Sequence, residues 1–367
     1  MKKIIIFAII LFTFNSVFAQ TAKPLTQAEY VKMLYASERD AGKKDELIEA
    51  IRRRGIDFEL TGGLRSLTAT KGRNDAELKR TVEEANRRRE NPNVGQLPKA
   101  EEVAKLINET RQNTLAAVDE MPDFVVKQRI KRSAAYAGTN NFKSLDNLIV
   151  AVSYRANGQE EYKLLSKNGV LESNPESKQS YSEVGGTSST GEFVTILATI
   201  FKRESDTKFE VVDTDTISGR PSVVFDFSIE RDKAQQKITS LGYIADSTIA
   251  GMKGRIWIDR EKFRVLKIES TATEIPSDFP VRTANRTISY DWVKINDEMY
   301  LLPSLSDVRL TFKQGRDVFE SRNLIQFKDY QKFGSEVIIL DDDNDEIIDD
   351  GTVKNLTENP TEEDNLK

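Results

Sequence analysis

Short runs of alternating apolar and polar residues, separated by turn residues, extend from Phe124 to about Leu340 and constrain the fold more than any other feature. Such a series is typical of antiparallel strands joined by hairpins, and Asn157-Gly158 and Asn168-Gly169 are strong hairpin signals. Several runs place apolar side chains on one face and mostly charged or Thr side chains on the other: Ile256 with Ile258, Leu266 with Ile268, Ile288 with Tyr290 and Trp292, and Val308 with Leu310 and Phe312. The sequence therefore predicts an antiparallel meander with one apolar and one hydrated face.

An apolar sheet face has to be covered by another layer. A second sheet would make a sandwich, whereas a curled sheet would make a barrel or half-barrel whose mouth a helix could close. We expect an α+β protein in which an N-terminal helical domain precedes a curved antiparallel sheet. This sheet would be an incomplete β-barrel with an amphipathic helix across its concave face.

One helical pattern interrupts the strands at residues 188–201. Its apolar residues Phe193, Ile196, Leu197, Ile200 and Phe201 follow the spacing i, i+3, i+4, i+7, i+8. Ser189 and Glu192 have the spacing of a capping box, and Gly185-Gly186 provides a hinge, as a movable lid would need. The periodicity leaves open whether this face closes a pocket or completes a core. If it closes a pocket, the expected ligand-binding residues are Phe193, Ile196, Leu197, Ile200, Phe201, Ile256, Ile258, Ile288, Tyr290 and Trp292.

The N-terminus indicates export. Lys2 and Lys3 precede an apolar run from Ile4 to Phe14, and the small-residue motif at Ala19 is a cleavage site. The run is shorter than the ~20 residues that a membrane span needs. We therefore expect a signal peptide at residues 1–19, cleavage near Ala19, and a periplasmic or extracellular mature chain without a transmembrane span. No Cys follows the cleavage site, so the chain is not expected to be a lipoprotein.

Residues 20–120 are expected to form the helical domain. We expect four helices. The first begins at a Thr26…Glu29 capping box, the second lies within residues 45–58 and ends at Gly55, the third begins near Asn74, and the fourth begins after Lys99. Arginine runs at 52–54 and 87–89 lie beside acidic residues, which favours solvated helix faces over a nucleic-acid interface. This domain is a candidate surface for an envelope protein partner.

The residue types present limit the chemistry. The chain has no His and no Cys, which removes the commonest general base, the usual partner of a nucleophilic Ser and the commonest transition-metal ligand. No G-x-S-x-G, P-loop or HExxH motif occurs. Residues 341–367 are acidic and expected to be disordered. The start of this segment superficially resembles an EF-hand calcium loop, but it does not match the pattern, because Glu346 stands where Gly is required at position six and Thr352 where Glu is required at position twelve. We therefore expect a protein that is not an enzyme, with no metal site and no cofactor.

We expect residues 121–340 to form one domain, the antiparallel half-barrel. Its sequence from Phe124 to Leu340 resembles the Lol-type outer-membrane lipoprotein carrier and receptor fold. The matching segments are YRANGQEEYKLLSKNG, GEFVTILATIF, GRPSVVFDFSIE, GRIWIDREKFRVLKIE, YDWVKINDEMYLLP and IQFKDYQKF. The resemblance implies an apolar cavity for acyl chains, with lid helices that shift on loading. This chain departs from the family in its preceding helical domain and in lacking the receptor's lipidated Cys.

These observations predict an exported, non-catalytic protein that binds a hydrophobic ligand in a half-barrel cavity. The ligand would be a lipid or an acylated protein, bound through its acyl chains. The alternative is a structural or interaction module of the bacterial cell envelope with a filled core and no ligand. A cavity of about 300 Å³ or more beneath the helix would suit the first hypothesis.

Overall fold

The computed structural model describes residues 23–90, 97–139, 141–171, 187–188, 190–234, 236–241 and 245–333. The chain forms two compact units, Met1–Gln96 and Leu97–Lys367. The predicted signal peptide, the hinge at Gly185-Gly186 and the acidic tail lie outside the described residues. Within the described part of the chain, no helix has the length and apolar character needed to cross a membrane.

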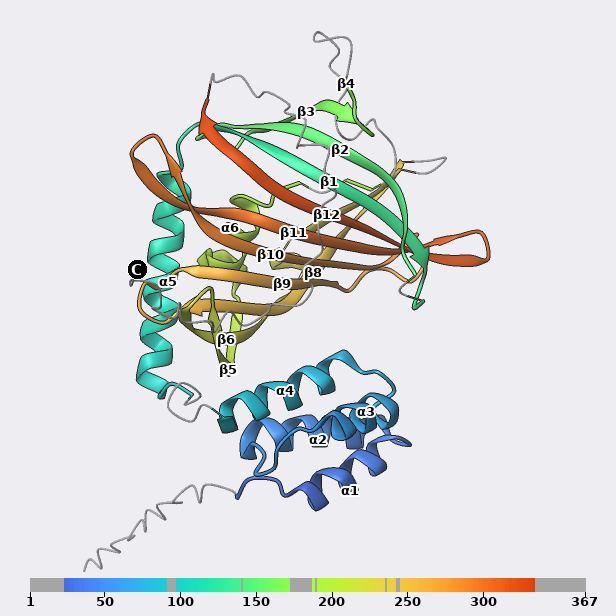
Figure 1. The fold of residues 1–367 in the computed structure, drawn as a ribbon. Helices are drawn as coiled ribbons and strands as arrows, with labels where there is room; N and C mark the ends of the chain where they lie inside the picture. The colour runs from blue at the N-terminus through green and yellow to red at the C-terminus, as the bar shows by residue number, and fades with distance from the viewer. Residues whose placement is uncertain are drawn as a thin grey trace, which may run out of the picture. The chain divides into compact units, whose positions relative to one another are not determined.

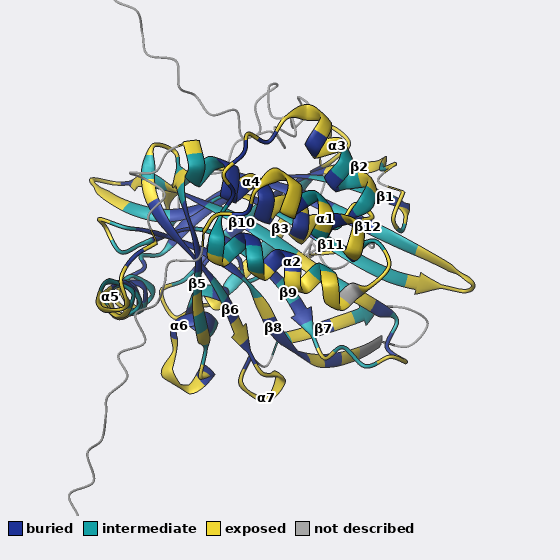
Figure 2. Ribbon diagram, turned by 90° about the horizontal axis from the view of Figure 1, so that it is seen from below, coloured by how far each residue is buried: buried dark blue, intermediate teal, exposed yellow. Residues whose placement is uncertain are grey.

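The described residues of the first unit, 23–90, form four helices: α1 (Gln27–Ser37), α2 (Ala41–Arg54), α3 (Gly62–Lys71) and α4 (Ala76–Glu90). The predicted Thr26…Glu29 capping box is confirmed, and Gly55 ends α2 with a φ of 68°. Helix α3, which the sequence patterns did not indicate, begins at the N-cap Thr61. Buried residues on one face of the helices meet in a core that includes Tyr30, Ile51 and Leu78, and Figure 2 shows the exposed residues in yellow on the other faces.

The second unit begins with the long helix α5 (Ala100–Asp119). Leu106 of α5 is buried in the same apolar cluster as strand residues Ile256 and Ile288. The last helix of the expected helical domain therefore packs with the sheet, and the two compact units divide after Gln96 rather than near Glu120.

The rest of the second unit is an open antiparallel sheet, which confirms the expected fold class (Figure 1). Its strand order is β4-β3-β2-β1-β12-β11-β10-β9-β8-β6-β5, with β7 paired to β8. The strands are β1 (Phe124–Tyr136), β2 (Lys143–Tyr154), β3 (Glu160–Lys167), β4 (Val170–Leu171), β5 (Lys208–Ile217), β6 (Arg220–Ile229), β7 (Gln236–Leu241), β8 (Ala245–Asp259), β9 (Val265–Thr273), β10 (Val281–Ile295), β11 (Glu298–Gln314) and β12 (Asp317–Lys332). Both predicted Asn-Gly turns are present, at β2–β3 and β3–β4, with positive φ at Gly158 and Gly169. The first strand pairs with the last one, so the two hairpin series join through β1 and β12.

Cross-strand register places one apolar row across the sheet. Residues that pair directly on neighbouring strands point to the same face. The row runs through Leu148, Ile130, Ile325, Ser306, Ile288, Ile268, Ile256 and Phe225, from β2 to β6. All eight are buried. We call the face that carries this row the inner face.

Helices rather than a second sheet cover the inner face. Figure 1 shows the sheet curling, with α6 inside the curve and α5 running past the strand ends. Helix α6 (Thr195–Phe201) is shorter than expected, and its N-cap is Val194, which makes no side-chain capping bond. The predicted Ser189…Glu192 capping box is wrong because Glu192 belongs to the turn that precedes α6; Ser189 itself is outside the described residues. Two short helical segments, a 3-10 turn (Arg203–Ser205) and α7 (Arg231–Ala234), complete the second unit.

Candidate ligand-binding face

The ten residues expected to contact a ligand lie mainly in one apolar cluster. Seven of them are buried in the cluster around β8, which we call the β8 cluster: Ile196, Ile200, Phe201, Ile256, Ile258, Ile288 and Tyr290. Leu197 is partly buried and packs against this cluster. Phe193 belongs instead to a second cluster around β1, the β1 cluster. Trp292 is partly buried, with the Arg220 guanidinium 5.8 Å from its ring centroid. The structure thus brings α6 and the predicted strand residues together, with Phe193 and Trp292 at other positions on the inner face.

Phe193 is held by aromatic rings of the β1 cluster. Its ring centroid lies 5.4 Å from that of Phe124, 5.5 Å from Phe327 and 6.2 Å from Tyr154. The contacts with Phe124 and Phe327 are edge-on, a favourable geometry for aromatic pairs. The side chain is 1% exposed, so the turn before α6 is inserted deeply into the inner face.

Side chains from other elements hold the C-terminal end of α6. Arg111 of α5 donates from Nε to the Phe201 carbonyl at 3.1 Å, and Thr207 donates to the Ile200 carbonyl at 2.6 Å. These bonds satisfy carbonyls that a helix terminus leaves without partners. Helix α5 is in turn tied to the β8–β9 turn by a two-bond contact between Arg260 and Glu102, at 2.6 and 3.0 Å.

Glu160 on β3 holds the other end of this segment. Its Oε2 accepts from the Gly191 amide at 3.3 Å and also from the Tyr162 hydroxyl. Gly191 has a φ of 80°, a left-handed conformation that a side chain would strain. The Gly191–Val194 turn is therefore fixed by a carboxylate that reaches across from the sheet.

This carboxylate lies in an unusual electrostatic environment. Burial raises the pKa of Glu160, and the nearby Glu192 carboxylate raises it further, while the Tyr162 hydroxyl, the Gly191 amide and Arg286 oppose the rise. Glu192 itself is 0% exposed. Burial also raises the pKa of Tyr290 far above its usual range, with Arg286 opposing and Glu192 adding to the shift. Two carboxyls, an Arg and buried Tyr residues thus influence one another electrostatically around the turn, and sequence periodicity gave no signal for this grouping.

Besides the indole Nε1 of Trp292, the amide or hydroxyl groups of three uncharged side chains on the inner face have no hydrogen bond. These three are Gln128 on β1, Ser306 on β11 and Tyr290 on β10, whose polar side-chain atoms find no partner among the residues that the structure describes. Gln128 and Ser306 are 0% exposed and Tyr290 is 6% exposed. Buried polar groups normally have a partner, so these three are exceptions.

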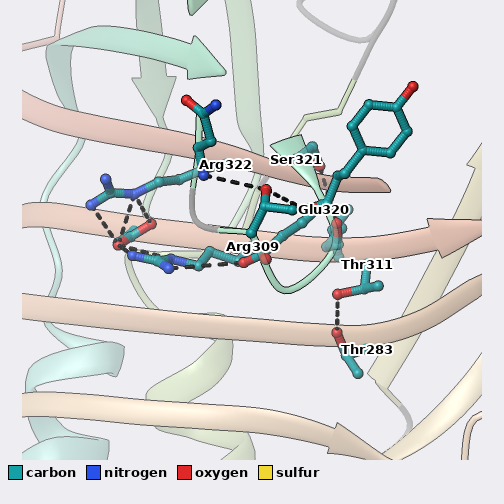
Figure 3. Close-up of polar contacts among 11 residues, drawn as sticks. Thr283, Arg309, Thr311, Glu320, Ser321 and Arg322 are labelled. Carbon is teal, nitrogen blue, oxygen red and sulfur yellow. Dashed lines mark hydrogen bonds and ion pairs between the residues drawn. The ribbon is translucent and has the colours of Figure 1, made fainter. Parts of the chain in front are cut away.

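The opposite, outer face carries paired charges. Arg309 and Arg322 both contact Asp307, at 3.2 and 2.9 Å, and Thr283 and Thr311 share a hydrogen bond of 2.7 Å between their hydroxyls (Figure 3). These groups satisfy one another across neighbouring strands, which accounts for them structurally.

Three Asp side chains in the strands of the second unit have structural partners. Asp226 pairs with Arg255 at 2.7 Å, and Asp215 accepts from the Trp257 indole at 2.9 Å. Asp259 accepts from the amides of Glu261 and Lys262, so it holds the β8–β9 turn. Across the described ranges, no group of three or more acidic side chains is placed to hold a metal ion.

A surface pocket of about 830 Å³ lies elsewhere on the second unit. Its lining residues are Glu230, Arg231, Asp232, Ile249 and Glu274. None of the ten expected ligand residues lines it. Its largely charged lining does not suit an acyl chain.

Comparisons with known proteins give limited similarity. No protein-family model matches the sequence, and no curated protein matches it. A solved structure of a DUF1329 family protein from Desulfovibrio piger is similar at 8% identity and a TM-score of 0.26, covering 63% of this chain and 95% of that one. Two structures of MucB with MucA, one described as from Pseudomonas aeruginosa, are similar at 8% identity and a TM-score of 0.17, covering 60% and 61% of this chain and 94% of theirs. At these TM-scores we draw no conclusion about function from the matches.

Proposed function

We propose that this protein binds a hydrophobic ligand, a lipid or the acyl chains of a lipoprotein, on the inner face of its sheet. The observation that carries the proposal is the buried row from Leu148 to Phe225, which one short helix and the flank of α5 cover. In this proposal α6 moves off the row when the ligand binds, and its apolar face then packs against the bound acyl chains. Such a movement is what the resemblance to the Lol-type fold implies.

The energies make such an exchange feasible. Burial contributes ~0.8 kcal/mol per CH₂, so a chain of about 14 carbons offers roughly 11 kcal/mol. Five apolar side chains of residues 193–201 contribute ~1.5–3 kcal/mol each, or roughly 8–15 kcal/mol in total. The two quantities are comparable. An isolated helix of seven residues is marginal in water, so α6 has little structure of its own to lose when it leaves the sheet.

Native mass spectrometry of the purified full chain tests the proposal. We expect co-purifying lipid on the wild-type protein and none on Phe193→Asp or Leu197→Asp. Leu171→Asp is a matched control, because Leu171 is 61% exposed on the edge strand β4. The proposal fails if wild-type protein carries no lipid and Leu197→Asp is as stable as wild type.

The second candidate is an interaction module with a filled interior. It is favoured by the packing of Phe193, Ile196, Ile200 and Phe201, each at most 4% exposed. The first unit would then contact another envelope protein. Pull-down with the full chain and with a chain lacking residues 23–96, which keeps α5, distinguishes the two candidates: loss of a protein partner with unchanged lipid content supports the interaction module.

Export is part of the proposal. We propose that residues 1–19 are a signal peptide and that the mature chain acts in the periplasm or outside the cell. N-terminal sequencing of the protein recovered from cell fractions is expected to start at Gln20. A chain that retains Met1 would contradict this expectation.

A further inference from the structure

The three amide and hydroxyl side chains without partners lie within four consecutive strands of the inner face. Gln128 pairs with Phe327 on one side of β12, and Ser306 pairs with Ile325 on the other side, two residues along. Tyr290 lies two residues beyond Ile288, the direct partner of Ser306. These three residues lie on β1, β11 and β10, and β12 separates β1 from β11. With strands about 4.8 Å apart, the four consecutive strands span roughly 14 Å.

The sheet itself has no need for polar side chains at these positions. Gln128 sits between Val150 and Phe327, and Ser306 sits between Ile288 and Ile325. Apolar side chains would complete the row and would avoid the cost of buried, unpaired polar atoms. Their polar groups therefore point to a partner that is bound only part of the time.

The chemistry of the three groups selects an uncharged partner. An amide and two hydroxyls offer both donors and acceptors without a net charge. The neighbouring buried ion pair on this face, Arg132 with Asp146, is closed by two hydrogen bonds of 2.6 Å. Arg286 and Glu192, of opposite charge, both act on Tyr290. An ester, with its carbonyl and a nearby hydroxyl, fits this setting better than a phosphate or a carboxylate does.

We propose that the inner face recognises an acylglycerol through Gln128, Ser306 and Tyr290. The acyl chain lies along the apolar row, the ester carbonyl accepts hydrogen bonds from the Gln128 amide and the Ser306 hydroxyl, and a glycerol hydroxyl bonds to Tyr290. This proposal rests on the proposed function, since it specifies the chemical class of the hydrophobic ligand.

The test uses displacement of the fluorescent dye N-phenylnaphthylamine from the full chain by two competitors. Monomyristoylglycerol has the ester and the hydroxyls, whereas pentadecene has a chain of similar length and neither group. The variants are Gln128→Leu and Ser306→Ala. Thr311→Val is the control, because it removes a hydroxyl from the outer face (Figure 3).

We expect wild type and Thr311→Val to bind monomyristoylglycerol more tightly than pentadecene. In Gln128→Leu and Ser306→Ala, affinity for the ester falls by about tenfold while affinity for pentadecene is unchanged, since only hydrogen bonds to the ligand are lost. The ligand-free Gln128→Leu protein also unfolds at a higher urea concentration than wild type, because a buried polar group without a partner has been removed.

Three results would overturn the inference. If pentadecene displaces the dye from wild type as effectively as monomyristoylglycerol does, the hydrophobic site exists but the ester site does not. If Gln128→Leu is destabilised and keeps the wild-type preference, the amide is satisfied by bound water alone. If neither competitor displaces the dye from wild type, the proposed function is wrong and the ester site falls with it.

Discussion

Replacing Phe193 with Ala tests whether the turn before α6 is as firmly packed as the structure shows. The side chain is 1% exposed and lies against the rings of Phe124, Tyr154 and Phe327. Loss of a buried Phe side chain, together with the cavity that remains, typically costs about 3–5 kcal/mol. Edge-on ring pairs contribute about 0.5–1.5 kcal/mol each beyond burial, which favours the upper part of that range. We therefore expect the free energy of unfolding of the second unit to fall by about 4 kcal/mol.

The chain offers a selective assay for this change. Both tryptophans, Trp257 and Trp292, lie in the second unit, so intrinsic fluorescence during urea unfolding reports on that unit. Hydrogen exchange adds a local readout, and we expect amides of Thr195–Phe201 to exchange faster in Phe193→Ala than in wild type.

Phe58→Ala is the matched control, because Phe58 is 8% exposed in the core of the first unit. It should leave the tryptophan transition in place. A loss of less than about 1 kcal/mol in Phe193→Ala, with unchanged exchange in α6, would refute the packing argument, since a Phe→Ala change in a packed site costs more.

Three further predictions concern the second unit. Because the folded-state pKa of Glu160 is raised, the folded protein binds more protons than the unfolded chain just above pH 4.5, so stability falls as pH rises from there through the folded pKa. Urea unfolding should therefore show that the free energy of unfolding of wild type decreases relative to that of Glu160→Gln as pH rises through this window. A difference between the two proteins that does not change with pH would contradict the assignment. Burial raises the pKa of Asp259, but hydrogen bonds from the turn amides and Arg220 outweigh it and leave the pKa lowered, so its stabilisation is present above about pH 3.8 and is lost as pH falls through the folded value. Asp259→Asn should cost about 1–3 kcal/mol by urea unfolding at neutral pH and little at low pH, and an equal cost at both would count against it. Gly254→Ala should destabilise the second unit by about 3 kcal/mol or more, because a Cβ there would lie 1.9 Å from the Glu269 carbonyl oxygen; soluble expression with wild-type urea stability would show that β8 and β9 can separate without cost.

Local patterns in the sequence predicted the elements of the sheet well. Alternation identified the long strands, and the two Asn-Gly pairs placed the β2–β3 and β3–β4 turns, because each turn needs a residue with positive φ, which Gly158 and Gly169 provide. The amphipathic pattern identified the helix over the inner face, although its start was placed too early. The turn at Gly191 depends on Glu160, which is distant in sequence, so a local capping rule could not find it.

Helix α5 shows a different limit of sequence reasoning. Its periodicity predicted a helix correctly, and its neighbours along the chain suggested that it belonged with α1 to α4. Amphipathicity states that a helix has an apolar face, but not which surface covers that face. In the structure Leu106 meets the β8 cluster, and Arg260 and Arg264 of the β8–β9 turn bond to the helix.

The candidate site was predicted in part. Periodicity brought out the apolar members of the inner face, because burial imposes a regular spacing on apolar residues. Gln128, Ser306 and the Glu160–Glu192 pair have no such pattern, since a single polar residue in a strand looks the same whether it faces water or the interior. Only the register of β1, β11 and β12 shows that Gln128 and Ser306 flank one strand.

The sequence by itself determined most of the local structure of this protein: the strands, the hairpin turns, the helices other than α3 and the one-sided character of the sheet. These depend on backbone preferences and on contacts within a few residues. The tertiary structure alone decided that β1 pairs with β12, that α5 and α6 cover the inner face, and that three uncharged polar groups lie among its apolar side chains. Each of these depends on contacts between segments far apart in the chain, which are selected by the free energy of the whole fold and leave no periodic signal in the sequence.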